Sequence, residues 1–382
     1  MIDLSFPTPP ESQQAESFRE QVRDFLATEL AGRTPLQRVE SWMGFDAGFS
    51  RRLGEQGWIG LTWPKQYGGS ERSALERYVL LEELLAAGAP VAAHWIADRQ
   101  SGPLLLRYGT EAQKQAILPR ITRGECFFCI GMSEPDSGSD LAAARTYAEP
   151  VDDGFIVNGT KLWTTYGHKA HYMVLFCRTS RDHEDRHGGT SQLLIDLTLP
   201  GITIRPIHDL SGAHHFNEVV FENVQVPRDA LIGEMGDGWN QVLSELAFER
   251  SGPDRFLSTL WVLIELIRAL EGRDDDQSRI AVGRLAAHLM SLRRLSRSVA
   301  GMLQRGENPT LQAAIVKDLG ALLEQEIPDI ARQLVDTGRA DAAHRDFFQV
   351  LHYAVQQVPA FSLRGGTREI LRGIIARGLG LR

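Results

Sequence analysis

The chain has 382 residues, of which 43% are hydrophobic, 24% are charged and 8% are aromatic. These proportions are typical of a globular protein and exclude general disorder. At roughly 100–200 residues per domain, the length predicts two or three domains. The 41 Lys and Arg against 49 Asp and Glu give a net charge of -8, so nucleic acid and acidic membranes are not expected as partners.

From the sequence we expect neither a membrane-spanning segment nor a signal peptide. No apolar run approaches the ~20 residues needed to span a bilayer, and residues 1–6 lack a basic start followed by an apolar stretch. We therefore expect a cytoplasmic protein. The cysteines are Cys126, Cys129 and Cys177, and no other Cys or His completes a metal site around the first two, so we expect reduced thiols and no metal.

The first part of the chain is predicted to be helical. Phe18, Val22, Phe25, Leu26 and Leu30 recur at the three- and four-residue spacing of an amphipathic helix over 11–30. Further helices are expected at about 44–54, 74–87, 90–107 and 111–120, with Gly and Pro between some of them. These segments make an N-terminal α-helical domain over 1–122.

The pattern changes to short β-branched and aromatic runs, which predict strands at 127–132, 155–157, 172–177, 192–197, 202–207 and 219–226. Asp153-Gly154 and Asn158-Gly159 are favoured hairpin dipeptides. A middle antiparallel β domain is expected over 123–235. Residues 180–190 favour a solvated loop, and a metal site at its His183 and His187 is the weaker interpretation.

Helical periodicity returns after residue 238, with polar breaks at 271–278 and 306–309. An apolar stripe predicts a bundle helix, and its members are Leu285, Leu289, Leu292, Leu295, Val299 and Leu303. The C-terminal helical bundle is assigned to 236–382. The predicted fold class is therefore α+β and multi-domain, since segregated helices and strands argue against a doubly wound parallel sheet.

One segment stands out chemically: residues 131–140, Gly-Met-Ser-Glu-Pro-Asp-Ser-Gly-Ser-Asp, directly after a predicted strand. Such a loop can present backbone N–H groups and hydroxyls to a polar cofactor. On composition alone, a tight turn with local side-chain caps is the commoner outcome.

This loop resembles that of the acyl-CoA dehydrogenase family of flavoenzymes at every fixed position. Similar landmarks follow the family's order at 109–114, 118–121, 158–165, 216–224, 236–239 and 365–370. The resemblance implies a helical domain, a β-barrel-like middle domain and a four-helix bundle. It also implies FAD as the cofactor.

The resemblance assigns FAD contacts residue by residue. In the loop they are Met132, Ser133, Gly138 and Ser139, with Ser133 bonding the isoalloxazine and Ser139 near the pyrophosphate or the CoA. Trp163 and Thr165 match the strand that covers the flavin. Trp163 alone would be interpreted as a core aromatic, and its spacing to Thr165 and Gly167 is what favours the functional interpretation. Thr367 and Glu369 match contacts near the chain end.

The catalytic base is expected to be a carboxylate. Many family members carry it directly before the C-terminal Gly-Thr, where this chain has Gly365. A branch typified by isovaleryl- and long-chain acyl-CoA dehydrogenases supplies a Glu before an Arg on the first bundle helix, which matches Glu249-Arg250. The resemblance implies that Glu249 is the base and that Arg250, Ser139 and Gly365 contact substrate. Arg250 would support the active site electrostatically without accepting the proton, and Gly365 would donate its backbone N–H.

An alternative for Glu249 is a solvated helix residue in an ion pair. Its neighbours four positions away are Glu245 and Pro253, and neither can form one. The chain also departs from the family: its Arg-x-x-Phe-Gly element is only loosely similar to 268–272, and Tyr166 and Ser137 replace a frequent Asn and Ala.

The leading interpretation is an FAD-dependent acyl-CoA dehydrogenase that forms a 2,3-enoyl thioester and passes electrons to electron-transfer flavoprotein or a similar acceptor. The alternatives are a non-catalytic or half-active subunit of a hetero-oligomer, and a flavin oxidase or monooxygenase. A homotetramer, or a heterotetramer with a related subunit, is expected. The sequence does not identify the acyl group, and it does not decide whether the thioester is carried by CoA or by a carrier protein.

Overall fold

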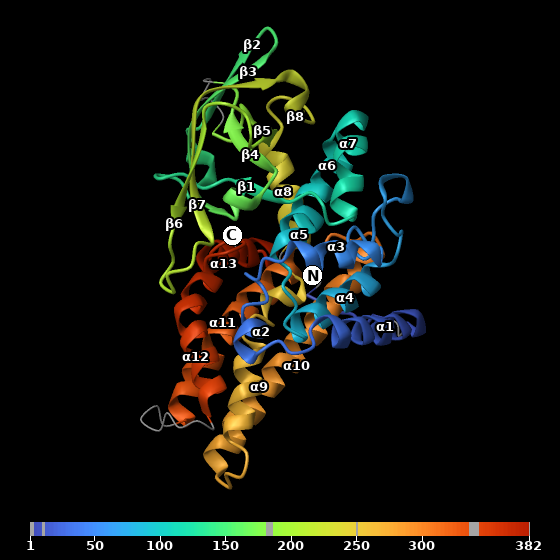
Figure 1. Cartoon of the computed structure of the whole chain (residues 1–382), viewed down its shortest axis with the longest axis vertical. Coiled ribbons are helices and arrows are strands. Elements are labelled where there is room, and N and C mark those ends of the chain that lie inside the picture. The colour runs from blue at the N-terminus through green and yellow to red at the C-terminus, as the bar shows by residue number, and fades with distance from the viewer. Residues whose placement is uncertain (1–3, 10–11, 181–185, 250, 336–343, 382) are drawn as a thin grey trace. The chain divides into compact units, whose positions relative to one another are not determined.

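Figure 1 shows the computed structural model of the chain, which describes residues 4–9, 12–180, 186–249, 251–335 and 344–381, without the side chains of 245–249. The chain divides into two compact units. The helical unit comprises Met1–Phe45, Arg72–Ala92 and Ala247–Arg382, and the sheet unit comprises Asp46–Glu71 and Ala93–Leu246. Both are discontinuous in sequence, and the domain ranges 1–122, 123–235 and 236–382 stay a prediction.

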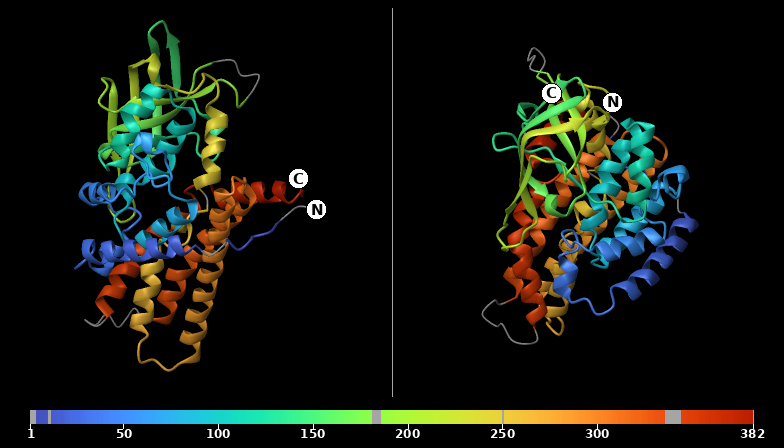
Figure 2. Two further views of the ribbon diagram at one scale, coloured as in Figure 1. Left: turned by 90° about the vertical axis from the view of Figure 1, so that its right-hand side faces the viewer. Right: turned by 45° about the horizontal axis from the view of Figure 1, so that its top comes forward.

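The helical unit joins N-terminal helices to the C-terminal ones. Its helices are α1 (Gln13–Glu29), α2 (Pro35–Val39), α4 (Ala74–Ala86), α9 (Leu260–Ala269), α10 (Asp276–Gln304), α11 (Thr310–Leu334), α12 (Arg345–Gln357) and α13 (Arg368–Gly378), with the short turns η6 (Pro253–Arg255) and η8 (Val358–Ser362). Helices α9 to α12 run side by side (Figures 1 and 2). Helix α4 contacts both α1 and α10.

The predicted apolar stripe lies along α10. Leu285, Leu292 and Val299 are buried, and Val299 packs with Ala313 and Val316 of α11. The helix begins where Asp275 accepts a hydrogen bond from the Ser278 N–H at 2.7 Å, a typical N-cap. Burial of this stripe against α11 therefore positions the longest helix of the unit.

The sheet unit contains β1 (Phe128–Gly131), β2 (Tyr147–Val151), β3 (Gly154–Thr165), β4 (Tyr172–Arg178), β5 (Thr190–Asp196), β6 (Ile202–Ile207), β7 (Phe216–Pro227) and β8 (Leu231–Ile232). The strand order is β6-β7-β3-β2-β4-β5-β8, and β1 pairs with β4. The sheet is mixed, because β1 runs parallel to β4 and a single parallel bridge joins β2 to β4, whereas the other pairs are antiparallel.

Helices also belong to the sheet unit: α3 (Ala47–Glu55), α5 (Ala92–Ile96), the π-turn η2 (Ala97–Ser101), α6 (Gly102–Tyr108), α7 (Glu111–Thr122) and most of α8 (Gly238–Glu249). Short 3-10 turns lie at η1 (Lys65–Tyr67), η3 (Leu141–Ala143), η4 (Gly167–Lys169) and η5 (Arg228–Ala230). The Gln113 side-chain amide of α7 donates to the carbonyls of Asp229 at 2.7 Å and Leu231 at 3.0 Å, which fixes this helix to β8.

The two predicted hairpin dipeptides behave differently. The expected hairpin is present between β2 and β3, but its turn residues are Asp152 and Asp153, and Gly154 is the first residue of β3. The prediction for Asn158-Gly159 was wrong, because this pair lies inside β3, where the register with β7 shifts. Gly159 has a φ of 145°, and a Cβ there would lie 2.7 Å from Thr146 Cα. The glycine thus permits a close approach of two backbone segments in place of a turn.

The three cysteines are buried and free in the sheet unit, and burial raises the pKa of Cys126 to about 11 and that of Cys177 to about 12. No helix within the described ranges is long and apolar enough to cross a membrane. Among the same residues, no group of three or more His, Cys, Asp or Glu side chains could hold a metal ion. His183 lies outside the described residues.

Candidate active site

The second half of the 131–140 loop is a tight turn. Glu134 N donates to Ser137 O at 2.7 Å, and Ser137 N donates back to Glu134 O at 3.2 Å. The Ser137 hydroxyl donates to Asp140 O at 2.8 Å. The turn with local caps that composition favoured is therefore present, but it accounts for only some of the polar groups.

A buried ion pair anchors the loop to β3. Lys161, which is fully buried, donates to Glu134 Oε1 at 2.8 Å and to Met132 O at 3.1 Å. Glu134 also accepts from the N–H groups of Arg145 at 2.6 Å and Thr146 at 2.9 Å. Burial opposes ionisation, yet the Lys161 charge and these hydrogen bonds lower the pKa of Glu134. Sequence reasoning did not single out Lys161, although it is one of only five lysines in the chain.

Three of the predicted FAD contacts have hydroxyls that take no part in the hydrogen bonds of the described residues. Within the described part of the chain, the hydroxyls of Ser133, Ser139 and Thr165 have no hydrogen-bond partner. Ser133 lies beside β3, since its carbonyl accepts from Leu162 N at 2.8 Å. A Cβ on Gly138 would meet nothing within 4 Å, so the backbone there is open to a ligand.

Trp163 is not a core aromatic. Its residue surface is 57% exposed, and its φ is 59°, an uncommon backbone conformation for a bulky residue. It lies where the register of β3 with β7 shifts, and its ring meets Phe216 edge-on at 6.0 Å between centroids. Three residues on, the buried Tyr166 also has a positive φ, 50°. Such strained positions collect at functional sites, where surrounding structure holds them.

These residues fit a flavin. An exposed indole held at a bulge offers a flat surface to a ring system. The hydroxyl of Thr165 lies on the same strand, and that of Ser133 lies on the loop that is hydrogen-bonded to this strand. Met132 is half-buried and packs with Phe176 and Val242, which directs it away from solvent. The sheet unit therefore brings together the predicted contacts of the loop and of β3.

The remaining predicted FAD contacts lie in the helical unit. Thr367 caps α13 by accepting from Ile370 N at 3.4 Å, and Glu369 stands exposed in the first turn. Hydrogen bonds from its own backbone N–H and from Thr367 lower the pKa of Glu369. Gly365 precedes the cap with a φ of 68°. Both capping residues thus have a local structural role in addition to any contact with a cofactor.

The predicted base falls at the end of α8. Glu249 is the last residue of that helix, and its side chain lies outside the described part of the structure, as does Arg250. The described chain resumes at the buried Ser251 and continues into η6 with Asp254 and Arg255. What the structure specifies is therefore the turn that follows the predicted base.

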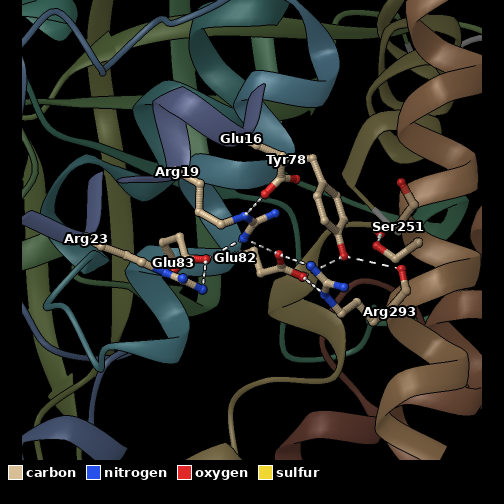
Figure 3. A network of polar contacts seen from close by, with 9 residues as sticks. Glu16, Arg19, Arg23, Tyr78, Glu82, Glu83, Ser251 and Arg293 are labelled. Carbon is tan, nitrogen blue, oxygen red and sulfur yellow. Dashed lines mark hydrogen bonds and ion pairs between the residues drawn. The ribbon is translucent and has the colours of Figure 1, made fainter. Parts of the chain in front are cut away.

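A buried polar network holds one end of this turn (Figure 3). The Ser296 hydroxyl of α10 donates to Ser251 O. Nearby, Glu82 of α4 binds Arg19 at 2.7 Å and Arg293 at 2.6 and 3.0 Å, and it accepts from the Tyr78 hydroxyl at 3.2 Å. Burial works against it, but the Arg293 hydrogen bonds and charge lower the pKa of Glu82. The network is completed by Glu16, Arg23 and Glu83.

A second buried cluster holds the other end. The Arg364 guanidinium donates to Glu324 at 3.0 Å, to Ser258 Oγ at 2.7 Å and to Asp254 O at 3.1 Å. Arg255 pairs with Asp254 at 2.9 Å. Sequence reasoning did not predict this cluster, because charged residues that are up to 110 positions apart give no local pattern.

Lys317 of α11 belongs to the same cluster and is fully buried, with its ammonium donating to Phe361 O at 2.7 Å. Burial, together with the charges of Arg255 and Arg364, lowers the pKa of Lys317 to about 7. In the 268–272 segment, Arg268 pairs with Glu265 at 2.5 Å within α9.

Helices at both ends of the sequence and a mixed sheet between them are the architecture of an acyl-CoA dehydrogenase, a class of oxidoreductase. Three family descriptions match in order: acyl-CoA dehydrogenase N-terminal domain over residues 12–125, middle domain over 129–224 and C-terminal domain over 236–380. The chain belongs to the acyl-CoA dehydrogenase family, whose members are FAD-dependent.

Several named relatives are similar to this chain over nearly its full length. Acyl-CoA dehydrogenase IpdE1 of Mycobacterium tuberculosis is 32% identical over 384 residues, which cover 97% of this chain and 98% of that protein. The solved structure named Tcur3481-Tcur3483 steroid ACAD has a TM-score of 0.83 at 27% identity, covering 97% of this chain and 98% of that one. The ChsE4-ChsE5 complex from Mycobacterium tuberculosis has a TM-score of 0.82 at 28% identity, covering 98% and 99%.

Proposed function

We propose that the protein binds FAD and dehydrogenates an acyl-CoA thioester to the 2,3-enoyl-CoA. The observation that carries the proposal lies in the 131–140 loop. Glu134 and Ser137 form its turn, whereas the hydroxyls of Ser133 and Ser139 have no hydrogen-bond partner among the residues that the structure describes. When bound, FAD supplies the two-electron acceptor that takes up the substrate's β-hydride at N5. Met132, Ser133, Gly138, Ser139, Trp163, Thr165, Thr367 and Glu369 are the residues that would hold it.

Glu249 removes the α-proton in this proposal. Its carboxylate accepts the proton as the Cβ–H electron pair leaves, and the Cα–Cβ double bond forms. Arg250 stabilises the ionised carboxylate. The backbone N–H of Gly365 donates to the thioester oxygen, on which negative charge develops as the proton is lost.

We propose that the substrate is a bulky, steroid-derived acyl-CoA and not a short branched one. The support is the name steroid ACAD borne by a structure that covers 97% of this chain at 27% identity. Electron-transfer flavoprotein or a similar acceptor would reoxidise the flavin, and a cytoplasmic location and assembly as a tetramer are part of the same proposal.

A second candidate function is that of a half-active subunit in a heterotetramer with a related chain. It is favoured by the glycine at position 365 and by the local pairing of Arg268, which leaves the family's Arg-x-x-Phe-Gly element unmatched. The ChsE4-ChsE5 structure is itself a complex of two named proteins.

The test is an anaerobic visible titration of the purified protein, supplied with FAD, with steroid-derived, branched, aromatic and dicarboxylic acyl-CoA thioesters. The variants are Glu249→Gln and, as a matched control on the same helix, Glu245→Gln. We expect one thioester class to bleach the flavin of the wild type and the control but not that of Glu249→Gln. Flavin that stays bound and oxidised with every thioester would contradict the proposal, and failure to bind flavin would favour the half-active subunit.

A further inference from the structure

We propose that Arg255 is a positioning residue that closes position 365 to any side chain and holds the Gly365 backbone in place. The inference deepens the proposed function, on which it rests, because it explains how the chain orients the N–H assigned to the thioester oxygen. It also explains why a base cannot stand at position 365 in this chain.

The contact between the two residues is close. A Cβ on Gly365 would lie 2.9 Å from Arg255 Nη2, 3.0 Å from its Cζ and 3.0 Å from its Nη1. Side-chain carbons do not approach three guanidinium atoms this closely, and the φ of 68° at Gly365 disfavours a side chain as well. The planar face of Arg255 thus occupies the space in which a side chain at 365 would begin.

Close packing prevents the Arg255 side chain from moving away from Gly365. It is 1% exposed, and its Nε donates to Asp254 at 2.9 Å. Its guanidinium also lies over the Trp42 ring at 5.8 Å. Its carbonyl lies 2.1 Å from where a Cβ on Gly320 of α11 would be, so that helix packs directly on the Arg255 backbone. Because both its guanidinium and its backbone are held in place, the buried Arg255 side chain cannot shift to make space for a neighbour.

The Gly365 segment is equally fixed on its other sides. Arg364, directly before it, binds Glu324 and stacks on Trp42 at 4.4 Å and Phe361 at 4.1 Å. Two residues after it, Thr367 caps α13. Gly365 and Gly366, with φ of 68° and 94°, form a short bridge between two anchored points, and Arg255 lies against it. The direction of the Gly365 N–H is therefore set by Arg255 on one side and by the two anchored ends of this bridge.

The experiment uses the full chain loaded with FAD and the thioester that bleaches its flavin most in the titration above, with isovaleryl-CoA as a second probe. The variants are Gly365→Ala, Arg255→Lys and the double variant, where lysine keeps the charge but lacks the guanidinium branches. Gly306→Ala is the control, because its φ is 73° and a Cβ there would meet nothing within 4 Å. Both kcat and KM are measured, and urea unfolding of the FAD-free chain gives a second readout.

We expect Gly365→Ala to lower kcat by about 10²-fold with little change in KM, since a misdirected donor at a developing oxyanion costs about that much. Arg255→Lys lowers kcat by about 10-fold, because even a displacement near 1 Å costs up to about 10². The double variant is more active and more stable than Gly365→Ala alone. Gly306→Ala leaves kcat unchanged.

The inference is overturned if the double variant is no better than Gly365→Ala in kcat and in unfolding, or if Arg255→Lys changes stability without changing kcat. Both results can occur while Glu249→Gln remains inactive, which would leave the proposed function standing. If the wild type oxidises neither probe nor any other thioester, the proposed function fails and the inference fails with it.

Discussion

The two fully buried lysines lie in different electrostatic surroundings. In the sheet unit, Lys161 donates directly to the carboxylate of Glu134. In the helical unit, Lys317 donates to a carbonyl and lies near Arg255 and Arg364. Burial lowers the pKa of both lysines, and for Lys317 the pKa falls to about 7. The Lys161–Glu134 ion pair thus fixes the 131–140 loop to β3. Lys317, which lies among arginines, can instead lose its proton near neutral pH.

Removal of the Lys161–Glu134 ion pair should cause the largest loss of stability. Lys161→Met leaves Glu134 buried without its cation, so we expect a loss of about 3–5 kcal/mol in the free energy of unfolding, measured by urea denaturation, and weaker FAD retention. The exposed Lys169→Met is the control. Adding Glu134→Gln to Lys161→Met should recover part of the loss, and failure to recover any would mean that the pair is not coupled.

Lys317 should make stability depend on pH. Its pKa is about 7 in the folded protein, below its usual value of 10.5, so the unfolded chain binds more protons between these values. Stability should therefore rise with pH from 7 to about 8.5, by up to about 1.4 kcal/mol per pH unit. Above that range the buried thiols, whose pKa values are raised in the folded protein, oppose the rise. Urea unfolding at several pH values checks this slope. The Lys317→Met variant should lack it, and an equal slope in both proteins would contradict the assignment.

The turn after the predicted base should respond to a smaller change. Ser296→Ala removes the donor to the buried Ser251 carbonyl, which costs about 1–3 kcal/mol. Because this turn follows Glu249, we also expect a lower kcat and an altered pH profile of kcat. Ser291→Ala on the exposed face of α10, whose hydroxyl bonds only Ala287 O among the described contacts, should change neither. A Ser296→Ala variant with wild-type kinetics would restrict the network to stability.

The smallest effect concerns backbone strain. Trp163→Gly relieves a positive φ and should raise the free energy of unfolding by up to about 1 kcal/mol, while FAD binding weakens because the exposed indole is lost. Fluorescence titration with FAD and urea unfolding separate the two effects. Glu71→Gly, at a φ of 53°, relieves similar strain and should leave FAD binding unchanged. A Trp163→Gly variant with full FAD affinity would contradict the assigned role.

Local patterns predicted most of the helices and strands. The spacing of Leu285, Leu292 and Val299 predicted α10, and the β-branched runs predicted most strands, because burial on one face leaves a periodic trace. The strand β2 and the short α2 were missed, since 147–151 contains Glu and Pro, and Pro35–Val39 is too short to show a period. Gly159 shows that a turn dipeptide can instead permit a close backbone approach.

The site was predictable only where its residues are contiguous. The 131–140 loop and Trp163 could be found in the sequence, but the partnership of Lys161 with Glu134, or of Arg255 with Gly365, spans 27 and 110 positions and depends on the packed structure. Arg255 and Lys317 also carry no local motif. Contacts that long-range packing creates leave no periodic signal in a single sequence.

The discontinuity of the helical unit has a consequence for biosynthesis. Glu82 is joined to Arg293, 211 residues further along the chain. At ~5–20 residues per second, a ribosome needs roughly 10–40 s to make that stretch. During this interval α1 and α4 exist without α10, and Glu82 lacks its arginine from α10. The segments translated first are therefore among the last to reach their final packing, and a chain released before α10 would carry exposed surfaces that recruit chaperones or proteases.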